Sequence, residues 1–244
     1  MAGLLEALES MRLVLEAISS GEYCCLRHGL PYITVGDLVR QALCEMRLHY
    51  EYSRGGVGEA RRRELRVLVE AVLEARRRVS EGFSDGVLST PLAAVVEGVP
   101  VVGRPDAILV SRGRVEAIVW AKVSRSTRVK PWDRVRLYSL GLLADYGGLP
   151  RSSLKLVLVV APEPAGLIEP LKLLRNRVEP GQGDGYSVHV LAYDREVALN
   201  YVGPLLAYWK GLRDPVARRS RACMDCPFRS ICGLGEEFDT NPRV

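Results

Sequence analysis

The sequence predicts an α/β fold in which a mixed central sheet is flanked by helices. Three observations support this fold class. Apolar side chains recur at helical spacing over residues 2–80, short β-branched runs separated by turns fill 86–124, and helical segments then alternate with apolar runs of strand length. The chain has 244 residues, of which 48% are hydrophobic. It is therefore long enough to bury a sizeable core in one large domain, with or without a small appendage.

Three helices are predicted in the N-terminal third of the chain. The first covers residues 2–19 and ends near Ser19-Ser20-Gly21, and the second covers 33–52 and ends before Gly55-Gly56. The third covers 58–80, where an apolar stripe is surrounded by arginines. Those arginines indicate a solvated face or, alternatively, a track for phosphates.

Strands and helices alternate in the rest of the chain. Four β-branched runs predict a meander of antiparallel strands over 87–96, 99–102, 107–110 and 115–123. The run Leu154–Val160 is continuously apolar, so we expect it at the centre of a sheet covered on both faces. The remaining predicted elements are helices over 131–144, 165–176 and 194–213, a turn over 179–185 and a last strand over 188–193.

The charge of the chain favours an acidic partner. Arginine carries almost all of the formal net charge of +5, because the chain has few lysines. Arginine makes planar, bidentate contacts with phosphate, so DNA is the expected partner, although a GC-rich genome or a hot habitat produces the same bias. No apolar run reaches the ~20 residues needed to cross a bilayer, and the N-terminus lacks a signal region. We therefore expect a cytoplasmic protein without membrane contact, in which thiols stay reduced.

Three cysteines near the C-terminus indicate a metal centre. Cys223, Cys226 and Cys232 form a C-x2-C-x5-C pattern, and Pro227 restricts the backbone beside the second thiol. Thiolates at such spacing can converge on one metal centre, which needs a fourth ligand from elsewhere in the chain. The alternatives are a zinc knuckle, a disulfide or ordinary buried thiols. The available fourth ligands are the other three cysteines, Cys24, Cys25 and Cys44.

A second group of residues is typical of a divalent-metal site. Asp106 follows Pro105, and Lys122 lies at the end of a predicted strand sixteen residues later. Many nucleases hold Mg²⁺ or Mn²⁺ with two carboxylates. One is an aspartate on one strand, and the other is an acidic residue two positions before a lysine on the next strand. The bound ion polarises the phosphate and activates water. Alternatively, Asp106 is a turn residue and Lys122 a solvated strand end.

These motifs together resemble a known nuclease family. The segments GRPDAILV, VEAIVWAKVSRSTR, WDRVRLYSLGLL and CMDCPFRSIC resemble RecB-like PD-(D/E)xK nucleases that carry an iron–sulfur cluster, in particular the CRISPR-associated exonucleases of spacer acquisition. ITVGDLVRQALCEMRLHYEY resembles the family's N-terminal segment, which places the first cluster ligand at Cys44. The resemblance covers about Ile33 to Gly233. It implies a restriction-endonuclease-like fold with a cysteine-ligated cluster subdomain.

The resemblance also implies cofactors and partners. It implies a 4Fe–4S cluster held by Cys44, Cys223, Cys226 and Cys232, a 2Fe–2S cluster being the variant form. It further implies Mg²⁺ or Mn²⁺ at Asp106, with Asp106 and Lys122 as catalytic residues. The expected partners are single-stranded or end-bearing DNA and other CRISPR adaptation proteins.

Several family positions carry different residues in this chain. Trp120 stands where the family has the acidic residue two positions before the lysine, and the family's catalytic histidine corresponds to a position near Val69. Arg136 and Leu140 stand where the family has its Gln-x-x-x-Tyr pair. We expect Trp120 to be a core or interface aromatic residue that fills the metal cavity. Alternatively, its side chain stacks on a DNA base. An indole cannot bind Mg²⁺, and one carboxylate makes a poor site for it. Glu116 lies about 20 Å from Lys122 along an extended strand, and Glu70 is the other acid that could fill the gap.

We expect four segments and weigh three functions. The segments are an N-terminal helical extension (1–32), a helical segment with one cluster cysteine (33–85), a nuclease-like core (86–213) and a C-terminal cysteine segment (214–244). The protein is expected to be a nuclease homologue with an impaired centre, an active metal-dependent DNA exonuclease, or a metal-stabilised scaffold that does not cleave DNA. In the first two cases, Arg104, Arg125 and Arg136 are the expected DNA contacts.

Overall fold

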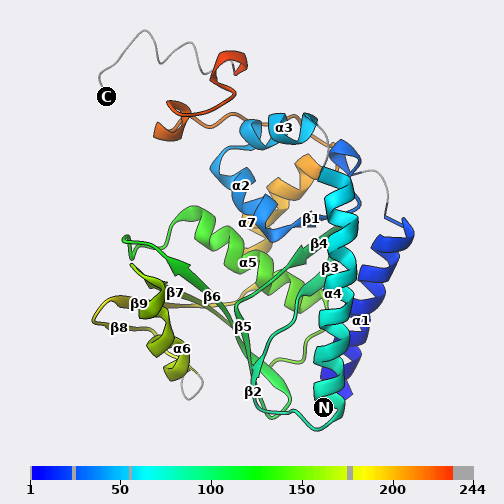
Figure 1. Ribbon diagram of the computed structural model, residues 1–244, viewed down its shortest axis with the longest axis vertical. Helices are drawn as coiled ribbons and strands as arrows, with labels where there is room; N and C mark the ends of the chain where they lie inside the picture. The colour runs from blue at the N-terminus through cyan, green and yellow to red at the C-terminus, as the bar shows by residue number, and fades with distance from the viewer. Residues whose placement is uncertain (1, 24–25, 55–56, 175–177, 233–244) are drawn as a thin grey trace.

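The computed structural model describes residues 2–23, 26–54, 57–174 and 178–232 (Figure 1). It has a six-stranded sheet with the order β2-β5-β6-β7-β9-β8 and a three-stranded sheet with the order β1-β4-β3. Helices cover these sheets, and the C-terminal segment extends from one end of the molecule, beside α2 and α3 (Figure 1). The predicted class, a mixed α/β fold with helices flanking a mixed sheet, is confirmed at this level.

The six-stranded sheet is mixed because one of its pairings is parallel. β6 (Arg114–Val123) runs parallel to β7 (Lys155–Ala161), whereas β2 (Gly86–Leu88), β5 (Ala107–Ser111), β8 (Gly181–Gly183) and β9 (Tyr186–Ala192) pair antiparallel. The predicted central strand is β7. Its residues 156–161 are buried, and alternate residues contribute to two separate hydrophobic clusters, one on each face.

The predicted meander is wrong in its pairing. The run 87–96 forms two strands, β2 and β3 (Leu92–Val96), which belong to different sheets: β2 pairs with β5, and β3 pairs with β4 (Val99–Gly103). Pro91 lies between them, and its missing N–H prevents the ladder from continuing through this position. In the smaller sheet, β1 (Ile33–Thr34) adds to β4 in parallel.

The predicted helix over 33–52 is also wrong, because it is interrupted. Thr34 caps α2 (Val35–Leu43) through a capping box with Asp37, and α3 (Glu45–Ser53) starts two residues after α2 ends. The residue between the two helices is Cys44, whose backbone is extended at φ −162° and ψ 108°. The break therefore changes the direction of the chain at the cysteine itself.

The remaining helices agree with the sequence patterns apart from their ends. α1 (Ala2–Ser20) packs on α4 (Val57–Ser80). α5 (Pro131–Tyr146) connects β6 to β7 and contacts α2 and α7 (Arg195–Trp209). The helix predicted over 165–176 is a 3₁₀ turn (Pro164–Leu167) followed by α6 (Ile168–Leu174), and the turn predicted over 179–185 includes the short strand β8. Among the described helices, none combines the length and apolar character that crossing a membrane requires.

Candidate functional site

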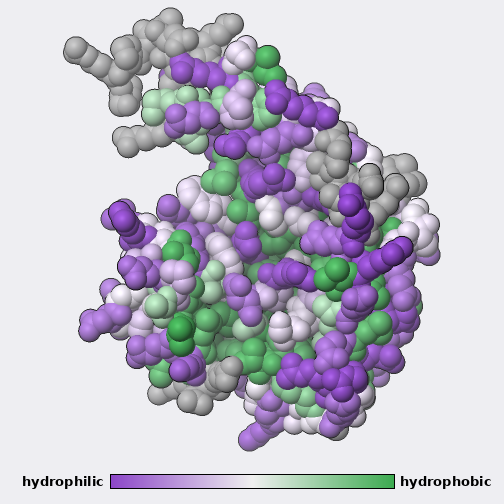
Figure 2. Space-filling model, in the orientation of Figure 1, coloured by the Kyte–Doolittle hydropathy of each residue, from purple (hydrophilic) through white to green (hydrophobic). Residues whose placement is uncertain are grey.

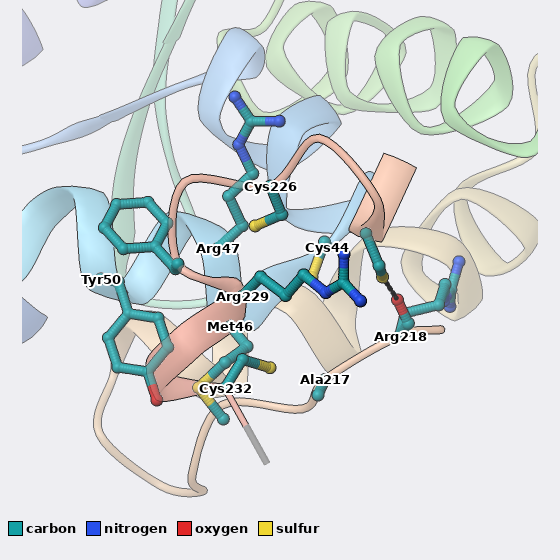
Figure 3. A pocket seen from close by; sticks show the side chains of 11 residues that line it. Cys44, Met46, Arg47, Tyr50, Ala217, Arg218, Cys226, Arg229 and Cys232 are labelled. Carbon is teal, nitrogen blue, oxygen red and sulfur yellow. Dashed lines mark hydrogen bonds between the residues drawn. The ribbon is translucent and has the colours of Figure 1, made fainter. Parts of the chain in front are cut away.

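Four cysteines from the two halves of the chain line one pocket. Cys44 comes from the α2–α3 break, and Cys226 and Cys232 come from the C-terminal segment (Figure 3). Cys223, from the same segment, also lines the pocket. All four are free thiols that are partly exposed, and the pocket encloses a cavity of about 20 Å³. The structure therefore brings together the four residues that the sequence suggested as ligands. Cys24 and Cys25, the alternative ligands, lie outside the described residues.

Tight turns place the three C-terminal thiols on the same pocket. Arg221–Cys223 and Arg229–Ile231 are 3₁₀ turns. The Cys226 amide donates to the Cys223 carbonyl at 3.3 Å, and the Cys232 amide donates to the Phe228 carbonyl at 3.0 Å. These turns keep the chain compact between Cys223 and Cys232, so all three cysteines can line the same pocket.

Contacts that do not involve sulfur hold the C-terminal segment against α3. Phe228 is only 3% exposed; its ring centroid lies 5.4 Å from that of Tyr50, and the Arg54 guanidinium lies 4.6 Å above it. The Tyr50 hydroxyl donates to the Ile231 carbonyl at 3.1 Å. This aromatic contact fixes the segment next to α3, the helix that begins directly after Cys44.

A buried carboxylate beside Cys44 provides a second attachment. Glu45 accepts hydrogen bonds from the side chain of Arg213, at 2.7 Å, and from the backbone amide of Val216, at 2.9 Å. Burial raises the pKa of Glu45, but the hydrogen bonds from Arg213, Gln41 and Val216 outweigh that effect and lower the pKa below its ordinary value. Glu45 is therefore a charged anchor for the chain that leads into the cysteines.

The spacing of the cysteine side chains does not match that of a single-ion site in the described structure. In the described part of the chain, no three histidine, cysteine or acidic side chains converge closely enough to hold one metal ion. In a 4Fe–4S cluster each thiolate binds a different iron, so such ligands stand farther apart than those of a tetrahedral zinc site. The four thiols line one pocket without converging closely enough to hold a single ion. Arg229 also reaches into the pocket in Figure 3, so a bound cluster would require this side chain to turn outward.

Asp106 directly precedes β5, and Lys122 lies on the neighbouring strand β6. The Asp106 amide donates to the Val119 carbonyl at 3.0 Å, and its carboxylate accepts from the Ala121 amide at 2.7 Å. Asp106 is exposed, and Lys122 is the residue after Ala121. The sheet thus brings the carboxylate of Asp106 to the backbone of β6 immediately before the lysine.

Lys122, however, is paired with another acid. Its ammonium group lies 2.8 Å and 3.0 Å from the two carboxylate oxygens of Asp133, a fully buried residue at the start of α5. Asp133 also accepts from the Lys130 amide at 2.9 Å and so caps the helix. The sequence reasoning missed Asp133. The signal was present in Lys130-Pro131-Trp132-Asp133, where Pro at the first helical position and an acid at the third are typical of a helix start.

Trp120 and Arg136 fill the position next to Lys122. The Arg136 guanidinium lies 4.5 Å from the centroid of the Trp120 ring, and its Nε atom is buried without a hydrogen-bond partner among the described residues. Burial lowers the pKa of Arg136, while the charges of Asp106 and Asp133 act in the opposite direction. The site thus holds two cations, an indole and two carboxylates, and the carboxylate of Asp133 is already paired with Lys122.

The other predicted residues lie on the surface. Arg104 and Arg125 are exposed, and so are Glu70 and Glu116, the two acids considered as replacements for the missing ligand. Glu70 lies on α4, which packs on α1, and Glu116 lies where the pairing of β5 with β6 shifts register. Neither acid has a contact with Asp106 or Lys122 in the described structure.

Comparisons with known proteins add little to this geometry. No family model matches the chain, and no curated protein is significantly similar to it. Among solved structures, the crystal structure of the archaeal protein SSO0001 is similar over 91% of this chain and 95% of that chain, with 18% identity and a TM-score of 0.42.

Proposed function

We propose that the protein is a CRISPR-associated, RecB-like DNA exonuclease homologue that contains an iron–sulfur cluster and whose nuclease centre is impaired. In this proposal the α/β core is of the PD-(D/E)xK type, and the protein binds or processes DNA during spacer acquisition with other adaptation proteins. The observation that carries the proposal is that Cys44 shares one pocket with Cys223, Cys226 and Cys232, far apart in sequence. The sequence motifs around Asp106 and Lys122 supply the nuclease part.

The cysteine pocket would serve stability. Cys44, Cys223, Cys226 and Cys232 would hold the cluster, which supplies a covalent link between α3 and the C-terminal segment. Four thiols suit a 4Fe–4S cluster, with 2Fe–2S as the variant and zinc as the alternative metal. The chain's own contribution is to present the thiols on turns and a helix break that Glu45 and Phe228 already hold in place.

The contacts of Lys122 support the proposal of an impaired centre. Lys122 pairs with Asp133, and the guanidinium of Arg136 covers the ring of Trp120, which occupies the place of the missing acid. Asp106 is then the one available carboxylate, which is too few for Mg²⁺ or Mn²⁺. Arg136, with the exposed Arg104 and Arg125, would instead contact the phosphates of bound DNA.

One observation favours the active enzyme as a second candidate. Asp133 is a further carboxylate at the same centre, and it contacts the lysine that an active site would use. If Lys122 released Asp133, Asp106 and Asp133 could both bind Mg²⁺ or Mn²⁺.

Three measurements separate the candidates. Visible absorbance and metal analysis of protein purified without oxygen test for iron and sulfide; a colourless protein with zinc contradicts the cluster. Degradation of end-labelled DNA with Mg²⁺ or Mn²⁺, compared between wild type and Asp106→Ala, separates an impaired from an active centre. A salt titration of DNA binding tests the third function, a metal-stabilised scaffold, which predicts no salt-dependent affinity.

A further inference from the structure

A groove lies beside the cysteine pocket, between α2–α3 and the C-terminal segment. Figure 2 shows the molecule hollowed between that segment and the body that contains α5. The groove has a volume of about 1340 Å³ out to its open side. Its lining is mostly apolar, with Leu43 and Leu48 among the residues, and it also includes Arg40, Arg47, Arg218, Glu51 and Trp132.

The charge of the groove is positive. Arg40 and Arg47 each bond Glu51 at 3.0 Å, yet about half of each arginine side chain stays exposed (49% and 48%). Arg47 donates to Glu51 through Nε. Within the described structure, its two terminal nitrogens donate to no acceptor. Arg218 donates one nitrogen to the Ala42 carbonyl at 2.9 Å and is exposed. Arg40 is also paired with Asp37 at 2.9 Å, so Arg47 and Arg218 are the guanidinium groups of the groove that can bind an anionic ligand.

Trp132 supplies an aromatic surface at the opposite wall. It is the second residue of α5 and is half-buried. The Lys130 ammonium lies 5.1 Å from its ring centroid, which adds a further cation beside the ring. The next residue is Asp133, the partner of Lys122, so the groove and the candidate nuclease centre meet at the start of α5.

We propose that this groove binds a single strand of DNA, with phosphates on Arg47 and Arg218 and a base stacked on Trp132. Guanidinium groups along a channel bind the backbone, and an indole in the wall stacks on any base that is not paired. A duplex keeps its bases stacked on one another, so it cannot use Trp132 in this way. The inference rests on the proposed function, since it names the surface that holds the DNA.

The experiment measures the affinity of fluorescently labelled oligo(dT) by anisotropy at several salt concentrations. Trp132→Ala is expected to weaken binding roughly 5- to 100-fold, whereas Trp132→Phe retains most of the affinity because it keeps a stacking ring. Arg47→Gln and Arg218→Gln are each expected to reduce the salt slope by about 0.7. The matched control is Arg114→Gln, the same change at an exposed arginine at the start of β6, which should bind like wild type.

The possible results are distinct. If Trp132→Ala and both groove arginine variants bind DNA with wild-type affinity, the groove is not the DNA-binding surface. That result does not contradict the proposed function. No DNA binding by metal-loaded wild type overturns both. Equal competition by duplex DNA or by poly-glutamate also overturns the inference, because neither presents an unpaired base. Metal content and melting temperature are measured for every variant, and the Phe variant keeps the test valid if Trp132→Ala is unstable.

Discussion

The guanidinium group of Arg136 covers the indole ring of Trp120 at 4.5 Å. Lys122 lies two residues further along β6, and its ammonium group is 6.0 Å from the centroid of the same ring. Two cations and an aromatic ring thus occupy the end of the strand where the sequence motif leads one to expect a metal ion between carboxylates. This arrangement underlies the expectation of weak or absent cleavage.

Cleavage is expected to appear when this stack is replaced by an acid. The double variant Trp120→Glu with Arg136→Gln restores a carboxylate two residues before Lys122 and removes one positive charge, so it should gain Mn²⁺-dependent degradation of end-labelled DNA. Adding Asp106→Ala to that variant should abolish the gain. Vigorous Asp106-dependent cleavage by wild type would show that the impaired-centre proposal is wrong.

The pair of Lys122 and Asp133 is expected to matter for stability. Lys122→Met leaves the buried Asp133 carboxylate without its cation and should lower the free energy of unfolding by about 3 kcal/mol. Adding Asp133→Asn removes the unpaired charge, so the double variant should lose less than the sum of the two single changes. Urea unfolding of the four proteins measures this coupling; additive losses would contradict it.

Loss of one cysteine ligand is expected to destabilise the fold. Cys226→Ser should reduce iron content and lower the free energy of unfolding by about 2–4 kcal/mol, as expected when a cross-link that closes a long loop is lost. Thermal melting and iron analysis measure the two effects. Cys25→Ser is the control, and the ligand assignment fails if that variant loses iron while Cys226→Ser keeps it.

Stability is expected to fall in mild acid because of His28. Burial, followed by the charges of His49 and Arg27, lowers the pKa of His28 to about 4, and His28 and His49 lie 2.9 Å and 3.1 Å from the Tyr208 hydroxyl. The folded state therefore binds fewer protons than the unfolded state between pH 4 and about 6.5, so the stability present at pH 7 is lost as the pH falls through this window.

The size of the acid effect is limited by partial exposure of the ring. We expect a loss of about 1 kcal/mol between pH 7 and pH 5, since solvent screens part of the shift. His28→Asn suits the test because His28 has a φ of 64°, a conformation that asparagine tolerates. Unfolding in urea at both pH values should show a smaller pH effect in this variant than in His189→Asn. An equal effect in both would rule out His28 as its source.

The sequence predicted features that depend on local patterns. The apolar run that became β7 and the spacing of Cys223, Cys226 and Cys232 were both visible in short windows. The helix break at Cys44 was not visible in a short window, because the apolar residues on both sides of it have helical spacing. Tertiary contacts decide where the helix stops. The pairing of β2 with β5 and of Lys122 with Asp133 depends on non-local contacts, which no single window of sequence contains.

The groove and the cysteine pocket have a common wall made of Cys44, Cys223, Cys226, Arg47 and Arg218. Oxidative damage to a cluster on one side of that wall would therefore change the surface that meets the strand on the other side. Under the functions proposed here, substitutions at the shared cysteines are expected to alter DNA binding in the groove as well as metal content.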